Sequence, residues 1–504
     1  MTRSSTLVSC LVDGQWIEPP ADRFADVWNP STGDVIARTP LCAAGLVDQA
    51  AQAAMRAWPA WRETPVPDRA RIMFRFRELL VSHADDLART VTLEHGKTLA
   101  ESRASVQRGV EMVEFACGLP SLLAGEIIEN LAPNVDSETV RHPLGVVAGI
   151  TPFNFPAMVP LWMFPTALVC GNCFILKPSE RVPLSSIKLG ELLLEAGIPD
   201  GIFSIVHGDK ICVDAILEHP QIKAVSFVGS TPVARHIYTT GATHGKRVQA
   251  NGGAKNHIII MPDADLDMTV QALQNAAFGC AGERCMAGSL AIPVGDVADE
   301  FVSRLSASAA RMRVGRTDTG ADIDMGPLIT QQHAERVRAH IDTAARDGAA
   351  VALDGRATRV ADAPNGFFVG PTIVDHIRPN MRIAAEEVFG PVLSVTRVAS
   401  LDEALALGER CAYGNGAVIF TQSGRAAREF KHRFNAGMIG INVGVPAPMA
   451  WFPFTGWNAS FFGDLHIQGR EGMMFYTQQR MTMTRWPAPS ARDAHDPVWR
   501  PGRG

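Results

Sequence analysis

Apolar residues recur at intervals of three and four positions in the first quarter of the chain. This spacing gathers apolar side chains on one face of a helix, and it predicts amphipathic helices over residues 45–61, 68–83 and 100–117. The pattern up to about residue 130 therefore indicates a helical scaffold.

From residue 145 onward, short apolar runs alternate with helical patterns. The runs predict strands at 145–150, 174–177, 203–207 and 224–228, each followed by a helix. Such alternation is typical of right-handed βαβ units and of a mostly parallel, doubly wound sheet. We therefore expect an α/β fold.

A second α/β run begins near Asp263, where aspartates stand in position to cap the next helix. The elements it predicts are helices at 268–278, 299–311, 331–346 and 401–410 and strands at 416–421 and 437–443. This half of the chain therefore reads as a second domain of a similar kind.

Residues 143–176 carry no charged side chain, and a run of that length could suggest a membrane span. Five prolines and three glycines divide it into pieces too short to cross as one helix. Buried parallel strands and one covered helix explain the run better, so no membrane partner is expected.

Near the C-terminus, residues 475–486 alternate in the manner of an exposed strand. An unpaired strand edge of this length favours pairing with another subunit. The final stretch is rich in Pro, Arg and Asp, and we expect it to form a loose tail.

Composition narrows the class of protein. The 504 residues are too many for one core, and 46% hydrophobic with 20% charged residues is ordinary for a globular chain. A net charge of −5 offers no basic surface for nucleic acid. The N-terminus lacks the apolar core of a signal peptide, which favours a cytoplasmic protein.

The nine cysteines show no framework spacing, which favours reduced thiols. Cys170 and Cys173 form a CxxC pair inside an apolar run. Without a second ligand pair, two buried core thiols are the stronger interpretation, and no metal site is predicted.

Cys285 is the candidate nucleophile. It follows the capped helix in a loop of small residues, Phe278-Gly-Cys-Ala-Gly-Glu-Arg-Cys-Met-Ala-Gly, that would leave a side chain accessible. The neighbouring cation of Arg284 favours the thiolate, the form that attacks. On this segment alone, a cysteine packed in a tight loop remains the alternative.

Asn154 stands where a predicted strand gives way to a helix. Its side-chain NH2, together with the backbone N–H of the nucleophile, could stabilise a developing oxyanion. Taken singly, Asn154 could instead cap the following helix.

Five motifs carry a resemblance that covers nearly the whole chain. They begin at Pro152 (Pro-Phe-Asn-Phe-Pro), Lys177 (Lys-Pro-Ser-Glu), Ser226 (Ser-Phe-Val-Gly-Ser-Thr), Gly279 (Gly-Cys-Ala-Gly-Glu-Arg-Cys) and Glu387 (Glu-Val-Phe-Gly-Pro). In this order they resemble the aldehyde dehydrogenases.

The resemblance implies an aldehyde dehydrogenase-like α/β fold: two doubly wound α/β domains and a small β oligomerisation arm. Residues 1–130 and 145–262 would form an NAD-binding domain and 263–445 the catalytic domain, with strands of a homodimer or homotetramer at 131–144 and 473–487 and a tail at 488–504.

The resemblance also implies NAD contacts at ten positions: Thr151, Phe153, Lys177, Glu180, Arg181, Gly229, Ser230, Gly252, Glu387 and Phe389. Glu180 would accept from the ribose 2′-OH and repel a 2′-phosphate, favouring NAD over NADP. Ser230 would open a helix whose N-terminus receives the pyrophosphate. Without the surrounding motifs, Lys177 and Glu180 would read as an exposed, salt-bridged turn.

One departure from the hydrolytic members of the family narrows the reaction. Where they carry a glutamate that activates water, this chain has Ala250, and a methyl group cannot abstract a proton. A thiol is then the better acyl acceptor, and coenzyme A fits. Glu283, two residues before the nucleophile, could replace the base, but we interpret it as a surface or hinge carboxylate.

Together with further motifs that begin at Phe155, Gly282, Gly444 and Phe452, Ala250 makes the chain similar to the CoA-acylating branch of the family, which oxidises malonate and methylmalonate semialdehydes. Such a substrate carries a carboxylate, and Arg108 and Arg284 are the candidate cations for it. For Arg108, a solvent-facing helix charge is the alternative. Two rival functions remain: a hydrolytic aldehyde dehydrogenase that releases a free acid, and a non-catalytic binding protein on the same fold.

Overall fold

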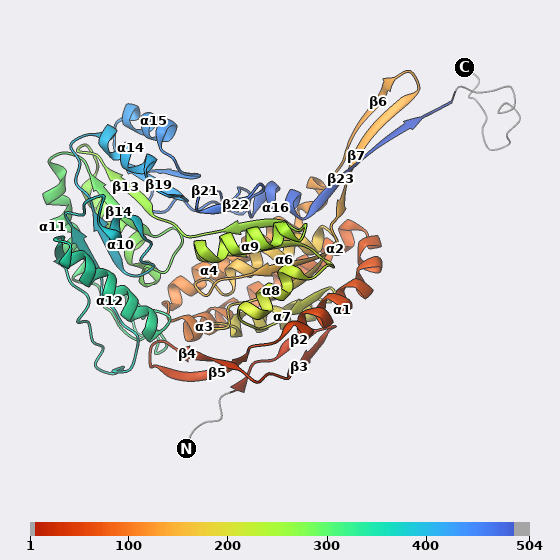
Figure 1. Ribbon diagram of the computed structural model, residues 1–504, viewed down its shortest axis with the longest axis horizontal. Helices are drawn as coiled ribbons and strands as arrows, with labels where there is room; N and C mark the ends of the chain where they lie inside the picture. The colour runs from red at the N-terminus through yellow and green to blue at the C-terminus, as the bar shows by residue number, and fades with distance from the viewer. Residues whose placement is uncertain (1–5, 488–504) are drawn as a thin grey trace, which may run out of the picture.

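The computed structural model describes residues 6–487, which build two large sheets with helices packed on them (Figure 1). The first sheet has the strand order β22-β12-β11-β8-β9-β10-β2-β3. Its parallel strands are β8 (Val146–Ile150), β9 (Cys173–Lys177), β10 (Phe203–Ile205), β11 (Ile222–Val228) and β12 (Arg247–Asn251). Four of these five were predicted from the apolar runs, and the prediction is confirmed.

The uncharged segment lies in the core of this sheet. It forms β8, then α6 (Met158–Val169), then β9, and every residue of α6 is buried. Cys170 and Cys173 are buried free thiols beside it. The prediction of buried strands with one covered helix is confirmed, and within residues 6–487 no helix is long and apolar enough to span a membrane.

Helices flank the first sheet, and three of them match the predicted scaffold. The helices of this half are α1 (Ala44–Glu63), α2 (Val66–Ser82), α3 (Ala84–His95), α4 (Leu99–Cys117), α7 (Leu184–Glu195), α8 (Lys210–Glu218) and α9 (Thr231–Thr243). α4 begins with a reciprocal capping box between Thr98 and Glu101.

Residues 6–40 are not helical, so the prediction of a helical scaffold is wrong there. They form short strands: β1 (Thr6–Leu7), β2 (Cys10–Val12), β3 (Gln15–Ile17), β4 (Phe24–Asn29) and β5 (Asp34–Pro40). Most are too short to show a period of two. The overlooked signal is Asp13-Gly14, both with positive φ, which forms the two-residue turn between β2 and β3.

The second sheet has the order β15-β16-β17-β14-β13-β19-β20 and is parallel except at β15. Its strands are β13 (Asn256–Ile260), β14 (Gly288–Pro293), β15 (Ala350–Leu353), β16 (Thr372–Asp375), β17 (Val392–Val395), β19 (Gly416–Phe420) and β20 (Met438–Ile441). The helices are α10 (Leu266–Phe278), α11 (Val297–Ala309), α12 (Gln331–Arg346), α14 (Leu401–Glu409) and α15 (Gly424–Arg433). The predicted second α/β unit is confirmed, and Asp265 caps α10 by accepting from the Met268 amide.

A three-stranded antiparallel arm projects from the body of the molecule (Figure 1). It consists of β6 (Glu126–Ala132), β7 (Val135–Pro143) and β23 (Thr477–Arg485). Both predicted strand regions are strands, although β6 starts inside the segment interpreted as helical, and Phe475 ends α16 (Gly469–Phe475). Pairing of this arm with another subunit stays a prediction, and the tail at 488–504 lies outside the described residues.

The C-terminal segment joins the two halves. β22 (Phe461–Gly463) pairs antiparallel with β12 of the first sheet, while β18 (Tyr413–Gly414) pairs with β21 (Trp457–Asn458). From the other side, Cys285 and Met286, which lie between α10 and β14, pack against the core of the first sheet. The loop that carries Cys285 therefore lies where the two halves meet.

Candidate active site

The nucleophile loop, residues 279–288, begins with a strained turn. Cys280, Ala281 and Gly282 have φ values of 50°, 50° and 72° in succession. Side chains with a Cβ disfavour this left-handed region. Gly282 is required there, because a Cβ would lie 2.1 Å from the Gly390 carbonyl oxygen. The loop therefore depends on contacts outside itself to hold its shape.

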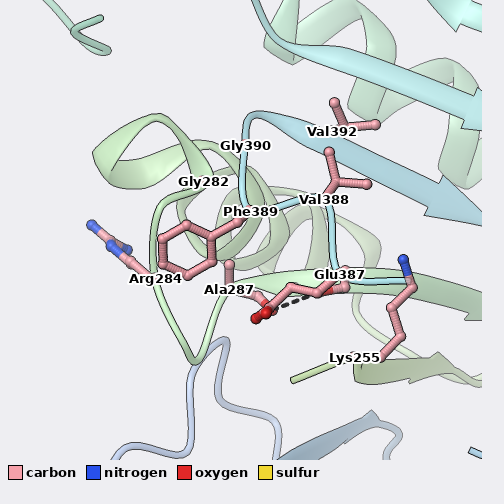
Figure 2. A pocket seen from close by; sticks show the side chains of 11 residues that line it. Lys255, Gly282, Arg284, Ala287, Glu387, Val388, Phe389, Gly390 and Val392 are labelled. Carbon is pink, nitrogen blue, oxygen red and sulfur yellow. Dashed lines mark hydrogen bonds between the residues drawn. The ribbon is translucent and has the colours of Figure 1, made fainter. Parts of the chain in front are cut away.

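Glu101 of α4 provides the first of these contacts. Its Oε1 accepts from the Cys280 amide at 2.6 Å and from the Arg284 guanidinium at 3.2 Å. Arg284 also donates to the Asn275 carbonyl oxygen at 3.2 Å. Figure 2 shows the Arg284 side chain turned away from Glu387 and Lys255. One half-buried ion pair thus holds the beginning of the loop against the other half of the molecule.

Cys285 is half-buried, and its backbone is held by two amides. Asn256 and Asn415 donate to the Cys285 carbonyl oxygen at 2.9 and 3.0 Å. Burial, followed by the negative charge of Glu387, raises the pKa of Cys285 to about 12, although its own amide and the Arg284 charge lower it. Arg284 thus favours the thiolate, as its place beside Cys285 in the sequence predicts, but burial has the larger effect on the pKa of Cys285.

Asn154 follows β8 and faces the nucleophile loop. Its Nδ2 donates to the Glu283 carbonyl oxygen at 2.9 Å, which leaves the second N–H of the amide for another acceptor. Its own backbone carbonyl accepts from Lys97 Nζ at 2.6 Å, and Lys97 is buried over the Phe155 ring. Asn154 does not cap α6, whose N-cap is Ala157. Asn154 is thus held beside the loop by one hydrogen bond at its side-chain amide and another at its backbone carbonyl.

The predicted dinucleotide residues that follow β8 and β9 lie together. Lys177 Nζ donates to Glu180 Oε2 at 3.1 Å, and the Arg181 guanidinium lies 5.9 Å from the centre of the Phe153 ring. Burial opposes ionisation of Glu180, but Lys177 and backbone hydrogen bonding hold the pKa of this carboxyl below its usual value. Thr151 continues the sheet by donating to the Lys177 carbonyl oxygen. Glu180 is therefore a charged acceptor among these residues. We refer to this group as the dinucleotide groove, for the cofactor that it is predicted to bind.

The end of β11 presents an open helix N-terminus. Ser230 is the exposed N-cap of α9, and its side chain makes no capping hydrogen bond. Gly229 precedes it, and its amide donates to the Asn251 carbonyl oxygen. Gly252 leaves no room for a side chain, since a Cβ would lie 2.8 Å from the Ala459 carbonyl oxygen. The first amides of α9 are thus available to an anion.

Glu387 and Phe389 line a pocket beside the nucleophile loop, together with Lys255 (Figure 2). Glu387 Oε1 accepts from the Ala254 amide at 3.0 Å, and burial raises its pKa to about 7. Phe389 has a left-handed backbone, with φ at 56°, and its ring meets the Phe153 ring edge-on at 5.8 Å. Motifs more than two hundred residues apart therefore converge here.

Ala250 is fully buried in β12 and offers no base. Glu283 is also fully buried, so its interpretation as a surface or hinge carboxylate is wrong. Its Oε1 accepts from the Ile329 amide at 3.2 Å, and burial raises its pKa well above the usual range. The part of the nucleophile loop that follows the strained turn therefore packs into the interior. Its partners there cannot be recognised from the local sequence.

The two arginines proposed for a substrate carboxylate have different partners. Arg284 bonds Glu101, as described, whereas the Arg108 side chain is 46% exposed and bonds Glu111 at 3.0 Å. Arg108 also contacts Met449 of the C-terminal segment. No contact joins the two guanidinium groups within the described chain.

Sequence reasoning missed the supporting residues Glu101, Lys97, Asn256 and Asn415. A signal existed for Glu101, because Thr98-x-x-Glu101 is a capping-box pattern. Asn256 and Asn415 stand at the starts of buried strands, where an amide needs partners, but nothing local says that both bond the Cys285 carbonyl. Lys97 carries no signal at all.

The chain is similar to known proteins over nearly its whole length. The model of the aldehyde dehydrogenase family matches residues 16–482. Malonate-semialdehyde dehydrogenase 3 of Geobacillus kaustophilus is 52% identical over 96% of this chain and 100% of its own length. Malonate-semialdehyde dehydrogenase of Pseudomonas aeruginosa is 48% identical over 96% of this chain and 97% of its own.

Solved structures show the same similarity. Methylmalonate-semialdehyde dehydrogenase of Oceanimonas doudoroffii superposes with a TM-score of 0.95 at 50% identity, over 97% of this chain and 100% of that one. A structure from Sinorhizobium meliloti 1021, complexed with NAD, has a TM-score of 0.95 at 44% identity, over 97% and 99% of the two chains.

Proposed function

Because this chain belongs to the aldehyde dehydrogenase family of oxidoreductases, we propose that it oxidises malonate or methylmalonate semialdehyde with NAD and transfers the acyl group to coenzyme A. The products are acetyl-CoA or propionyl-CoA, CO2 and NADH. The observation that carries the choice of acceptor is Ala250, a buried methyl group where hydrolytic members hold a glutamate base.

The groove residues suit NAD. The charged Glu180 can accept from a ribose 2′-OH, and the uncapped N-terminus of α9 at Ser230 can receive a pyrophosphate. Glu387 and Phe389 would hold the nicotinamide end beside Cys285. When bound, the cofactor supplies the hydride acceptor.

Catalysis begins at Cys285. Its sulfur passes its proton to solvent water and adds to the aldehyde carbon as the thiolate, and the new oxyanion accepts from the Cys285 amide and from the free N–H of Asn154. Lys97 and the Glu283 carbonyl keep the Asn154 amide in place. Loss of the hydride leaves an acyl group on Cys285 as a thioester.

Decarboxylation uses the same oxyanion donors. With a carboxylate in the β position, loss of CO2 places the electron pair in a thioester enolate, whose oxygen Asn154 and the Cys285 amide again serve. After protonation at carbon, the thiol of coenzyme A exchanges with Cys285 and frees it. Arg284 and Arg108 are the proposed cations for the substrate carboxylate, and Arg284 would exchange part of its contact with Glu101 for it.

Assembly is proposed through the arm of β6, β7 and β23. Its exposed apolar side chains support a homodimer or homotetramer; they are Ile127, Ile128, Leu131, Met481 and Met483.

The decisive experiment compares NADH formation from malonate semialdehyde with and without coenzyme A. We expect sustained turnover only with coenzyme A, together with a CoA thioester and CO2 in amounts equal to NADH. Full-speed release of free acid without coenzyme A would instead identify a hydrolytic enzyme. As a control, propanal tests the oxidation without the decarboxylation.

A further inference from the structure

A cluster of three titratable side chains lies behind Phe153, and the mechanism above does not use it. His95 ends α3 in the first half, whereas Glu283 follows the strained turn and His333 begins α12 in the second half. All three side chains are buried. His95 Nε2 lies 3.9 Å from Glu283 Oε2, and His333 Nε2 lies 3.5 Å from Glu283 Oε1.

The hydrogen bonding of this cluster is incomplete. Within residues 6–487, Glu283 Oε2 and both ring nitrogens of His95 have no partner. A buried charge without a partner is unfavourable, so the cluster is most stable when Glu283 is protonated. The carboxyl and His95 can then share that proton after a small shift or through one water molecule.

His333 links the cluster to Phe389. Arg336 donates to His333 Nδ1 at 3.1 Å, and since a guanidinium only donates, Nδ1 is the acceptor and Nε2 carries the hydrogen. That N–H donates to the Phe389 carbonyl oxygen at 2.7 Å. The His333 N–H therefore supports the left-handed backbone of Phe389. Glu283 Oε1 is the acceptor that competes with the Phe389 carbonyl for this N–H.

We propose that Glu283, with His95 and His333, is a positioning group that holds the nucleophile loop and Phe389 in register only while its carboxyl is uncharged. Ionised Glu283 would draw the His333 N–H away from Phe389 and place a negative charge two residues from Cys285. The inference rests on the proposed role of Cys285 but not on that of coenzyme A.

The charges around the cluster are consistent with this state. Lys97, Arg181 and Arg336 face Glu283 and lower its pKa, yet burial is the larger effect and raises it well above the usual range. Burial also lowers the pKa of His95 and brings that of His333 to about 4. Burial therefore favours the neutral form of all three groups, and a rise in pH favours ionisation of Glu283.

The test is the rapid burst of NADH after mixing enzyme, NAD and aldehyde without coenzyme A, from about pH 6 to about pH 10. The burst rate is divided at each pH by the rate at which Cys285 is alkylated, because formation of the thiolate alone raises the burst rate with pH. In the wild type we expect this corrected burst rate to fall at least about threefold at the alkaline end. Glu283→Gln, which mimics the neutral acid, should keep the neutral burst rate within about twofold and lose the alkaline fall. Glu283→Leu should slow the burst about tenfold or more at every pH.

The matched control is Glu94→Gln. Glu94 is likewise fully buried, one residue before His95, but it accepts from the Leu184 and Ser185 amides. This variant should lower the melting temperature, because an amide nitrogen replaces an acceptor oxygen, and keep the wild-type alkaline fall.

Three results would overturn the proposal: a wild-type burst without an alkaline fall, the same fall in Glu283→Gln, or loss of the fall in Glu94→Gln as well. If Glu283→Leu does not fold, the Gln variants decide alone. A burst that is normal without coenzyme A but not followed by acyl transfer would contradict only the proposed function.

Discussion

The dinucleotide groove and the nucleophile loop are built in opposite ways. In the groove, Lys177 and Glu180 follow one strand and pair with each other across three residues. In the loop, three successive residues have positive φ, and the partners come from Glu101, Asn154 and Ile329. The groove needs only regular βα turns, whereas the loop needs two halves of the chain packed together.

This difference has a consequence for substitutions. A change in the groove removes a local contact and leaves the strands in place. A change at the loop releases a strained turn that distant residues hold, so the nucleophile moves. Loop substitutions should therefore reduce the rate, and groove substitutions should mainly reduce cofactor affinity.

The largest effect is expected at Cys285. Cys285→Ala removes the sulfur and should abolish NADH formation, while NAD binding, measured by fluorescence titration, stays as in the wild type. Substantial remaining NADH formation would rule out covalent catalysis.

Asn154→Ala should come next. Removing one oxyanion donor lowers kcat about 10²- to 10³-fold, with little change in the KM for NAD. Steady-state kinetics measure both constants. A rise in the KM for NAD at unchanged kcat would place Asn154 in the groove instead.

Glu101→Ala tests whether Glu101 anchors the nucleophile loop or only caps α4. It frees the Cys280 amide and Arg284, and it should slow the NADH burst about tenfold to hundredfold. Thr98→Ala is the matched control, because it removes the capping side chain, costs about 1 kcal/mol of stability and leaves Glu101 in place. Equal burst rates in the two variants would show that Glu101 acts only as a helix cap.

Glu180→Gln tests the groove alone. Loss of a charged acceptor for the ribose should raise the KM for NAD about tenfold and narrow the preference over NADP, at nearly unchanged kcat. Kinetics with both cofactors provide the measurement. A large fall in kcat would show that the groove is not independent of the loop.

The smallest effect is expected at Arg108. Its half-exposed guanidinium is screened by solvent, so Arg108→Ala should raise the KM for malonate semialdehyde only about threefold to fivefold and leave propanal oxidation unchanged. Equal changes for the two aldehydes would end the assignment of Arg108 to the substrate carboxylate.

Much of the fold followed from local patterns. The strands β8 to β11 lie where apolar runs predicted them, and the helix α12 lies where the period of 3.6 did, because apolar runs and helix faces are short-range properties. The strands before residue 41 were missed, since each spans only two to seven residues. β2 also pairs with β10, far along the chain, whereas β1, β4 and β5 pair with one another in a small separate sheet.

Taken alone, the sequence determined the α/β architecture, and it predicted Cys285 as the nucleophile, Asn154 as its partner and Ala250 in place of the base. The tertiary structure decided which charges surround them: Glu283 turned inward, Arg284 occupied by Glu101, and a Cys285 thiol whose pKa burial raises. The physical reason is that period and motif are local, whereas burial and protonation depend on which distant surfaces exclude water.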